Sequence, residues 1–305
     1  MSSVKFYKFD GAGNDFVVID NRDGRFRASE EEVARICHRR FGVGADGLMV
    51  LENGECGKAG QSFDFEMKYY NSDGRLGSMC GNGGRCITAF AYILGVKGSE
   101  KGVEGSERTN GGDRHNCFHF KGYDGPHDAE VLSWDEEKRT GVVKLGMRNV
   151  ATKEMRRCLE GWFLDTGSPH YVQRVHDLEH FDVVGEGRRI RNIAEEFPMG
   201  TNVDFIEELP DGRLFVRTYE RGVEDETWAC GTGVTACAIV NVECGMRNEE
   251  RATQKVGLVT RGGDFEVTFD ATSEEYKDVC LIGPVALNFI GEWKLKENPY
   301  GVKKS

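Results

Sequence analysis

The sequence predicts an α+β fold built from two similar halves. Short aromatic and β-branched runs outnumber helical patterns, which indicates more strand than helix. The 305 residues suit two domains of about 100–150 residues each. The segment Cys80-Gly-Asn-Gly-Gly, which opens an apolar helix pattern, is matched by Cys230-Gly-Thr-Gly at the start of a second such pattern. Two ordered matches of this kind favour an internal duplication.

The first half begins with strands and one helix. Ser29-Glu-Glu-Glu32 has the pattern of a capping box, and Val33, Ile36 and Cys37 then fall on one helical face. A second helix is predicted over 85–94, with Gly95 as its terminating residue. Residues 98–116 are polar and rich in glycine and indicate a surface insertion. Strands are predicted at 4–9, 16–20, 47–51 and 63–70, and β-hairpins over 119–147 with a turn near 135–140.

The second half starts near Asn149 and repeats this mixture of strands and helices. A helix over 188–197 is expected to end before Pro198, and another over 233–243 before Gly245. Strands are predicted at 162–165, 170–175, 203–206, 214–220, 258–260, 264–269 and 278–282.

A second pair of segments supports the duplication. Gly13-Asn-Asp-Phe-Val17 is similar to Gly200-Thr-Asn-Val-Asp-Phe-Ile206. A duplicated fold implies a pseudo-two-fold axis, with a cleft between the halves and one cysteine-led helix from each half pointing into it. We therefore divide the chain into residues 1–148 and 149–284.

The charge balance excludes several classes of partner. Lysine and arginine total 40 and aspartate and glutamate total 51, which gives a net charge of −11. Such a chain repels phosphate backbones and anionic lipids, so neither a nucleic acid nor a membrane is an expected partner. No apolar run approaches the ~18 residues of a membrane span, and the N-terminal segment is charged where a signal peptide is apolar. We expect a cytoplasmic protein.

The ten cysteines show neither a zinc-ribbon nor a thioredoxin pattern, because no two have the spacing Cys-x-x-Cys. His115-Asn-Cys117-Phe-His119 is the one local cluster of metal-ligand type. It adjoins a polar, glycine-rich stretch, so we predict no metal site there. Cys86, Cys237 and Cys244 lie within or at the end of apolar helix patterns and are expected to be packing residues.

Cys80 and Cys230 have a different context, since each precedes Gly-x-Gly and a helix. Unpaired N–H groups at a helix start stabilise a thiolate and lower the pKa of a thiol below its free value of about 8.5. The same groups bind carboxylates. Two helix starts that face each other would hold the carboxylate of a ligand between them. One sulfur would then lie on each side of the α-carbon next to that carboxylate. That arrangement predicts stereoinversion, in which one thiolate removes the α-proton and the opposite thiol returns a proton.

These motifs resemble those of the diaminopimelate epimerase family over nearly the whole chain. The matching segments are Phe9-Asp-Gly-Ala-Gly-Asn-Asp-Phe16, Gly42-Val-Gly-Ala-Asp-Gly-Leu48, Tyr70-Asn-Ser-Asp-Gly74, Met79-Cys-Gly-Asn-Gly-Gly-Arg-Cys86, Gly167-Ser-Pro-His170, Gly200-Thr-Asn202, Tyr219-Glu-Arg-Gly222 and Ala229-Cys-Gly-Thr-Gly233. The resemblance implies a cofactor-independent isomerase that interconverts LL- and meso-diaminopimelate for lysine and peptidoglycan precursors. It also implies a homodimer of chains with two domains, each a barrel-like sheet around a central helix, and a C-terminal segment, 285–305, that returns to the first domain.

The resemblance also implies roles for single residues. Cys80 and Cys230 match the acid/base pair, and His170 and Glu220 match supporting catalytic groups near the thiols. The remaining matches are substrate-binding positions: Asn14, Asn71, Gly81, Asn82, Ser168, Asn202, Glu220, Arg221, Gly231 and Thr232. Glu220 can pair with an ammonium and Arg221 with a carboxylate, as a diamino-dicarboxylate requires.

Two positions depart from the family pattern. Gly47 stands where many members have a glutamine that contacts substrate, so that contact is expected to be missing or replaced by water. Ser168 stands where many have asparagine, which shortens one polar contact. Residues 98–116 are an insertion relative to compact members.

Two alternatives of other kinds remain open. Proline racemases and hydroxyproline epimerases share the paired cysteines, but they typically have histidine where Asn82 stands and an aspartate shortly before the second cysteine. Here Thr227-Trp-Ala precede Cys230.

A non-catalytic amino-acid-binding protein of the same fold would exchange no solvent deuterium into any amino acid. A dinucleotide site is disfavoured, because Phe16 stands where the last glycine of Gly-x-Gly-x-x-Gly is needed.

Overall fold

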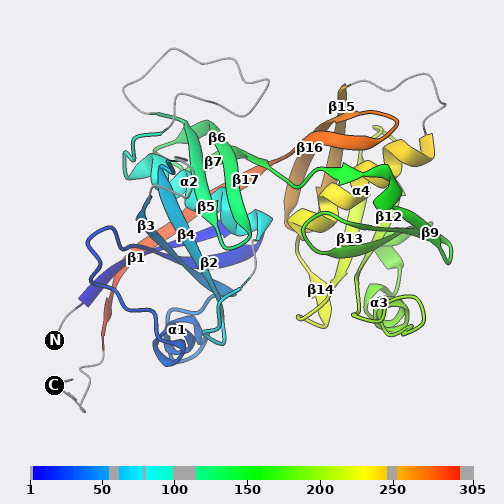
Figure 1. Cartoon of the computed structure of the whole chain (residues 1–305). Coiled ribbons are helices and arrows are strands. Elements are labelled where there is room, and N and C mark those ends of the chain that lie inside the picture. The colour runs from blue at the N-terminus through cyan, green and yellow to red at the C-terminus, as the bar shows by residue number, and fades with distance from the viewer. Residues whose placement is uncertain (1–2, 55–61, 78–79, 99–114, 246–252, 296–305) are drawn as a thin grey trace.

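The computed structural model describes residues 3–54, 62–77, 80–98, 115–245 and 253–295, and shows two lobes joined by one long strand (Figure 1). The helices are α1 (Glu30–Cys37), α2 (Gly81–Ile93), α3 (Val183–Arg191) and α4 (Gly231–Gly245). The strands are β1 (Ser3–Gly11), β2 (Asn14–Asp20), β3 (Gly47–Asn53), β4 (Phe65–Asn71), β5 (Cys117–Gly122), β6 (Gly125–Asp135), β7 (Thr140–Gly146), β8 (Val150–Ala151), β9 (Arg156–Cys158), β10 (Gly161–Asp165), β11 (Pro169–Arg174), β12 (Asn202–Glu208), β13 (Leu214–Glu220), β14 (Asp225–Thr227), β15 (Thr253–Thr260), β16 (Gly263–Ala271) and β17 (Glu275–Lys294). None of the helices among these residues combines the length and the apolar character that crossing a membrane requires.

The first lobe is a closed barrel. Strand pairing runs β1–β2–β3–β4–β5–β6–β7–β17 and returns from β17 to β1, with β2–β3 and β4–β5 parallel and the other pairs antiparallel. Helix α2 packs against β1, β6, β7 and β17, and all its residues from Gly81 to Ala91 are buried. A helix that is apolar on every side belongs in an interior, which is why α2 lies at the centre of this barrel.

The second lobe repeats the order of the first. The sheet runs β10–β11–β12–β13–β15–β16–β17, with β11–β12 and β13–β15 parallel in the places of β2–β3 and β4–β5. Strand β8 pairs with the other edge of β17, and α4 packs against β10, β11, β12, β13, β15, β16 and β17. The predicted α+β fold of two similar halves, each with a central helix, is therefore confirmed.

One of the two sequence matches used for the duplication pairs the wrong strands. Asn14 begins β2, which is antiparallel to β1 and parallel to β3. Asn202 begins β12, which is parallel to β11 and antiparallel to β13, so β12 corresponds to β3 and β2 corresponds to β11. The similarity arises because both strands start at the site end of their sheet with an asparagine and then become apolar.

Strand β17 belongs to both sheets. Its residues up to Ile282 pair with β8 and β16, whereas Gly283 to Lys294 pair with β7 and β1. The predicted return of the C-terminal segment to the first half is seen from Val285 to Lys294, and residues 296–305 lie outside the described part of the chain. The division into domains at residues 148 and 284 stays a prediction.

Three helices have boundaries that differ from those predicted. Helices α2 and α4 begin directly after their cysteines, at Gly81 and Gly231, because the glycines of both motifs take helical geometry. Helix α3 occupies 183–191 rather than 188–197, since the side chain of Asp182 caps it by accepting a hydrogen bond from Gly185 N. The first helix begins as predicted, with Ser29 Oγ accepting from Glu32 N at 3.2 Å. Most of the predicted insertion, 99–114, lies outside the described residues.

Candidate functional site

The starts of the two central helices meet between the lobes. Cys80 is the N-cap residue of α2, and Cys230 directly precedes α4. A Cβ added at Gly231 would lie 3.3 Å from Cα of Gly81, so the two helix starts are in backbone contact. Asn82 Nδ2 also donates to the carbonyl oxygen of Ala229 at 2.9 Å. The structure therefore brings the two predicted cysteine motifs together.

Cys80 lies at the end of the first barrel, beside β2. Its sulfur accepts a long hydrogen bond of 3.9 Å from Asn14 Nδ2, while Asn14 Oδ1 is buried without a hydrogen-bond partner. Burial raises the pKa of the Cys80 thiol; backbone N–H groups of Gly83 and Asn82 lower it in part, and the charge of Glu220 raises it further. The site around Cys80 thus contains a buried acceptor, Asn14 Oδ1, which can bind a donor on a ligand.

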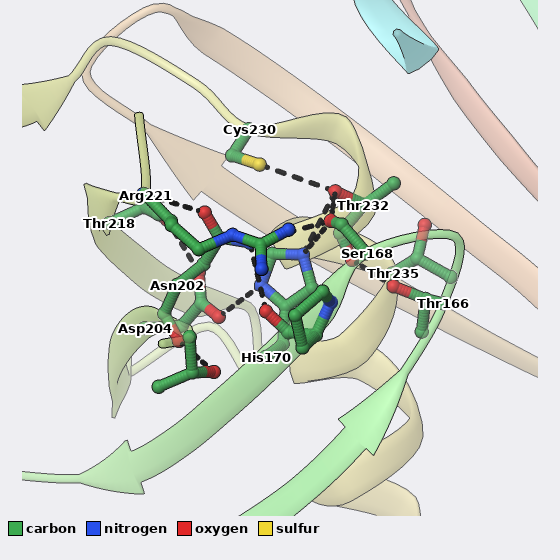
Figure 2. Close-up of polar contacts among 12 residues, drawn as sticks. Thr166, Ser168, His170, Asn202, Asp204, Thr218, Arg221, Cys230, Thr232 and Thr235 are labelled. Carbon is green, nitrogen blue, oxygen red and sulfur yellow. Dashed lines mark hydrogen bonds and ion pairs between the residues drawn. The ribbon is translucent and has the colours of Figure 1, made fainter. Parts of the chain in front are cut away.

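Cys230 ends a chain of hydrogen bonds from the second lobe (Figure 2). Its Sγ lies 3.4 Å from Thr232 Oγ1, which lies 2.9 Å from Nε2 of the fully buried His170. His170 Nδ1 in turn lies 2.7 Å from a carboxylate oxygen of Asp204. Asp204 orients the imidazole, and the imidazole orients the threonine hydroxyl against the sulfur. His170 thus reaches Cys230 through Thr232.

The expectation that the helix starts leave both thiols with lowered pKa values is wrong for this structure. Burial raises the pKa of Cys230 well above its ordinary value, and the charges of Glu220 and Asp204 add to the rise. Thr232 and the N–H of Gly233 lower it only in part. Desolvation of a thiolate at a buried position therefore outweighs the helix-end N–H groups at both cysteines.

The polar substrate-binding candidates of the second half form one connected cluster. Ser168 Oγ lies 3.0 Å from both His170 Nε2 and Thr232 Oγ1, and Asn202 Nδ2 donates to the carbonyl oxygen of Pro169 at 2.8 Å. Asn202 Oδ1 accepts from the backbone N–H of Arg221 at 2.8 Å. Ser168 thus joins the hydrogen-bond network of His170, even though its side chain is shorter than asparagine.

Glu220 and Arg221 lie at the end of β13. Burial raises the pKa of Glu220, and the nearby Thr227 opposes that rise in part. Glu220 is close enough to both thiols for its charge to raise their pKa values. The Arg221 guanidinium donates from Nη1 to the carbonyl oxygen of Met199 at 3.2 Å. Both side chains are partly buried, and Glu220 is the one whose charge acts on both sulfurs.

In the first half, Asn71 and Gly47 are paired across β3 and β4. The side chain of Asn71 is exposed. The space beside Gly47 is filled by protein, because a Cβ there would lie 2.5 Å from Cε2 of Tyr69. The ring of Tyr69 occupies the volume that a side chain at position 47 would take. The expectation that the glutamine contact of the family is missing or replaced by water stays a prediction.

Two buried charged residues at the site escaped the sequence prediction. Asp204 is fully buried and also accepts from Thr218 Oγ1 at 2.7 Å. The signal was a carboxylate between apolar residues, Val203 and Phe205. Arg85 is fully buried in α2 and donates to Asn82 Oδ1 at 3.0 Å. It orients the side chain that links the two helix starts, and no sequence pattern pointed to that role.

The predicted absence of a metal site concerned His115, Cys117 and His119. His119 Nδ1 lies 2.7 Å from a carboxylate oxygen of Asp128. Within the described ranges, no three histidine, cysteine or acidic side chains are grouped as a metal ion requires.

Comparisons with known proteins agree with this geometry. The family model described as diaminopimelate epimerase matches residues 6–115 and 162–287. A diaminopimelate epimerase of Flavobacterium psychrophilum is 39% identical over 94% of this chain and 98% of its own length. One of Chlorobaculum tepidum is 42% identical over 92% of this chain and 98% of its own.

A solved structure of a probable proline racemase from Agrobacterium radiobacter shares the fold. It has a TM-score of 0.66 and 14% sequence identity, over 98% of this chain and 94% of that one. Identity at this level reports architecture and does not favour proline as a substrate. The family model and the two relatives match most of this chain. The chain therefore belongs to the diaminopimelate epimerase family.

Proposed function

We propose that this protein interconverts LL- and meso-diaminopimelate by proton exchange at one α-carbon. The observation that carries the proposal is the contact between the two helix starts, each with a cysteine beside it. The names of the relatives supply the substrate, since diaminopimelate epimerases are similar to this chain over nearly their full length.

The reaction needs one base and one acid on opposite faces of the carbon. In our proposal, the thiolate of one cysteine takes the α-proton, and the electron pair left on the carbon is delocalised into the carboxylate. The thiol of the other cysteine then donates its proton to the opposite face and becomes the thiolate. Protons and charge balance over the turnover, so no cofactor is required. The N–H groups of Gly81, Asn82, Gly231 and Thr232 would stabilise the developing negative charge on the carboxylate.

The polar groups around the thiols support a substrate with two amino-acid heads. Asn14 Oδ1 has no partner in the structure and is an acceptor beside Cys80, as an ammonium group on the reacting carbon would need. Asn71, Ser168, Asn202, Glu220 and Arg221 would bind the second head, with Glu220 facing an ammonium and Arg221 a carboxylate. His170 would hold Thr232 in place against Cys230.

The test is incubation of the purified protein with LL-diaminopimelate in deuterated water, with no added cofactor. We expect meso-diaminopimelate to form, with one deuterium at the inverted carbon. Absence of both products would contradict the proposed function and favour an amino-acid-binding protein. Efficient racemisation of proline in a parallel reaction would favour the proline racemase alternative.

We further propose that the protein acts in the cytoplasm as a homodimer, without a nucleic-acid or membrane partner. The acidic net charge of −11 supports the last two points. Sedimentation velocity on the purified chain tests the homodimer, which predicts a species of twice the chain mass.

A further inference from the structure

Tyr69 lies between the core of the first barrel and the candidate site. On β4 it follows Phe65 and Met67 at every second position, and all three pack in the cluster that surrounds α2. The next residue on this face is Asn71, a proposed substrate contact. Tyr69 is therefore the last side chain of the barrel interior before the site.

Two glycines make room for its ring. A Cβ added at Gly47 would lie 2.5 Å from Cε2 and 2.9 Å from Oη of Tyr69. A Cβ added at Gly77 would lie 2.5 Å from both Cδ1 and Cε1. Neither glycine has a positive φ, so space for the ring, rather than backbone conformation, accounts for the missing side chains.

Tyr69 and Cys80 pack against the same cluster around α2. Gly83 is in the first turn of α2. A Cβ added there would lie 3.1–3.6 Å from Met49 Sδ, Cys80 Cβ and Met67 Cε. Met49 pairs with Tyr69 across the strands, and Met67 precedes it on the same face. Tyr69 is the next residue outward from Met67 on this face of β4, and it is close enough to Cys80 for the charge of that cysteine to raise the pKa of Tyr69.

We propose that Tyr69 is a further substrate-binding residue, whose hydroxyl oxygen accepts a hydrogen bond from the ammonium on the reacting carbon. This inference rests on the proposed function. It gives the ammonium two protein acceptors, Asn14 Oδ1 and Tyr69 Oη. A primary ammonium has three N–H donors, so it can donate to both acceptors of this pair.

The electrostatic surroundings agree with this role. Burial raises the pKa of Tyr69, and the charges of Cys80, Asp46 and Glu220 raise it further. The hydroxyl therefore stays neutral while a thiolate forms beside it. A neutral hydroxyl can accept from an ammonium without adding a second negative charge next to the base.

The test is Tyr69→Phe, which removes the hydroxyl and keeps the ring. We expect the KM for LL-diaminopimelate to rise roughly tenfold or more, as for the loss of a hydrogen bond to a charged group, with kcat within a few-fold and an unchanged melting temperature. The matched control is Tyr70→Phe, because Tyr70 packs in the other cluster, against α1, and should leave KM unchanged.

The outcomes separate this inference from the proposed function. If the wild type does not epimerise diaminopimelate, both are overturned. If the wild type is active and Tyr69→Phe has the same KM, only the role of Tyr69 is wrong, and the tyrosine is a packing residue. A fall in kcat with KM unchanged would also overturn it, since the proposed contact is made to bound substrate before any bond changes.

Discussion

Cys80 and Cys230 differ from the other described cysteines in position. Each stands directly before a central helix, and the two helix starts touch. Cys86 and Cys237 lie inside these helices and are fully buried, as expected of packing residues, whereas Cys244 is exposed near the end of α4. Location at the helix start, more than burial, singles out the two candidates.

Replacement of either candidate thiol should abolish epimerisation. Because each sulfur is proposed to act on one face of the same carbon, Cys80→Ala and Cys230→Ala should each lower kcat by roughly 10²–10⁴-fold or more, the range for a missing acid or base. Conversion of LL- to meso-diaminopimelate is the assay, and Cys86→Ala is the control. Near-normal turnover by either single variant would refute the two-base assignment.

The raised pKa values of the thiols predict the pH dependence of the free enzyme. Burial raises the pKa of both Cys80 and Cys230, so the required thiolate becomes more abundant as pH increases toward those values. We expect kcat/KM, which reports the free enzyme, to be still rising above the ordinary thiol pKa of about 8.5. A profile that is level from about pH 6 to 9 would show that the thiolate forms at much lower pH.

Arg221 is predicted to recognise a charge of the second amino-acid head. Arg221→Met keeps much of the side-chain length and loses the guanidinium, so kcat/KM for diaminopimelate should fall severely while the circular dichroism spectrum stays unchanged. Arg174→Met is the control, because Arg174 is a partly exposed arginine that pairs with Glu208. An unchanged kcat/KM for Arg221→Met would make this residue an ordinary surface charge.

Among the secondary-structure elements, the starts of α2 and α4 constrain each other most directly. Gly231 faces both Leu281 and Gly81. A Cβ added at Gly231 would lie 3.0 Å from Leu281 Cδ2 and 3.3 Å from Gly81 Cα. The leucine side chain can move, but the backbone of α2 cannot move without shifting Cys80. A side chain at position 231 would therefore change the separation of the two thiols.

Gly231→Ala should lower kcat/KM by roughly 10–100-fold, because small displacements of reacting groups are costly. The melting temperature should change little, since only one methyl group is added. Gly245→Ala at the other end of the same helix is a matched control, as its Cβ would meet nothing within 4 Å. If both variants were equally active, the helix contact would have no bearing on the chemistry.

The whole molecule is two lobes that share β17, so the site is assembled from halves far apart in sequence (Figure 1). The direct link from Asn82 to Ala229 connects the residues beside the two cysteines. Both sulfurs are free in this structure, and both stand at helix starts that touch.

We therefore predict reversible inactivation by mild oxidation with a small disulfide reagent. Two thiols would lose two protons and two electrons to the reagent and form a Cys80–Cys230 bond, which requires Cβ atoms about 3.5–4.5 Å apart. A reductant should restore activity, and bound substrate should protect by holding the sulfurs apart. Peptide mapping identifies the bond, and a Cys244→Ser variant removes an exposed competing thiol. Inactivation that follows a different cysteine pair would contradict the prediction.

The sequence by itself determined the features that depend on neighbouring residues. The two Cys-Gly-x-Gly segments, the cap at Ser29 and the hairpins from β5 to β7 are local patterns, and each was predicted from them. The duplication was also visible, because the same local motif occurs twice. Family membership followed from the ordered motifs.

Only the tertiary structure decided properties that depend on distant residues. The true counterpart of β12 is β3, which a short sequence match cannot distinguish from β2 because strand partners are set by the sheet. The partnership of Asp204 with His170 joins neighbouring strands, and the Tyr69 ring fills space that two distant glycines leave open. The direction of the thiol pKa shifts also depends on the tertiary structure. The helix start is a local feature, but the burial that outweighs it arises only in the folded chain.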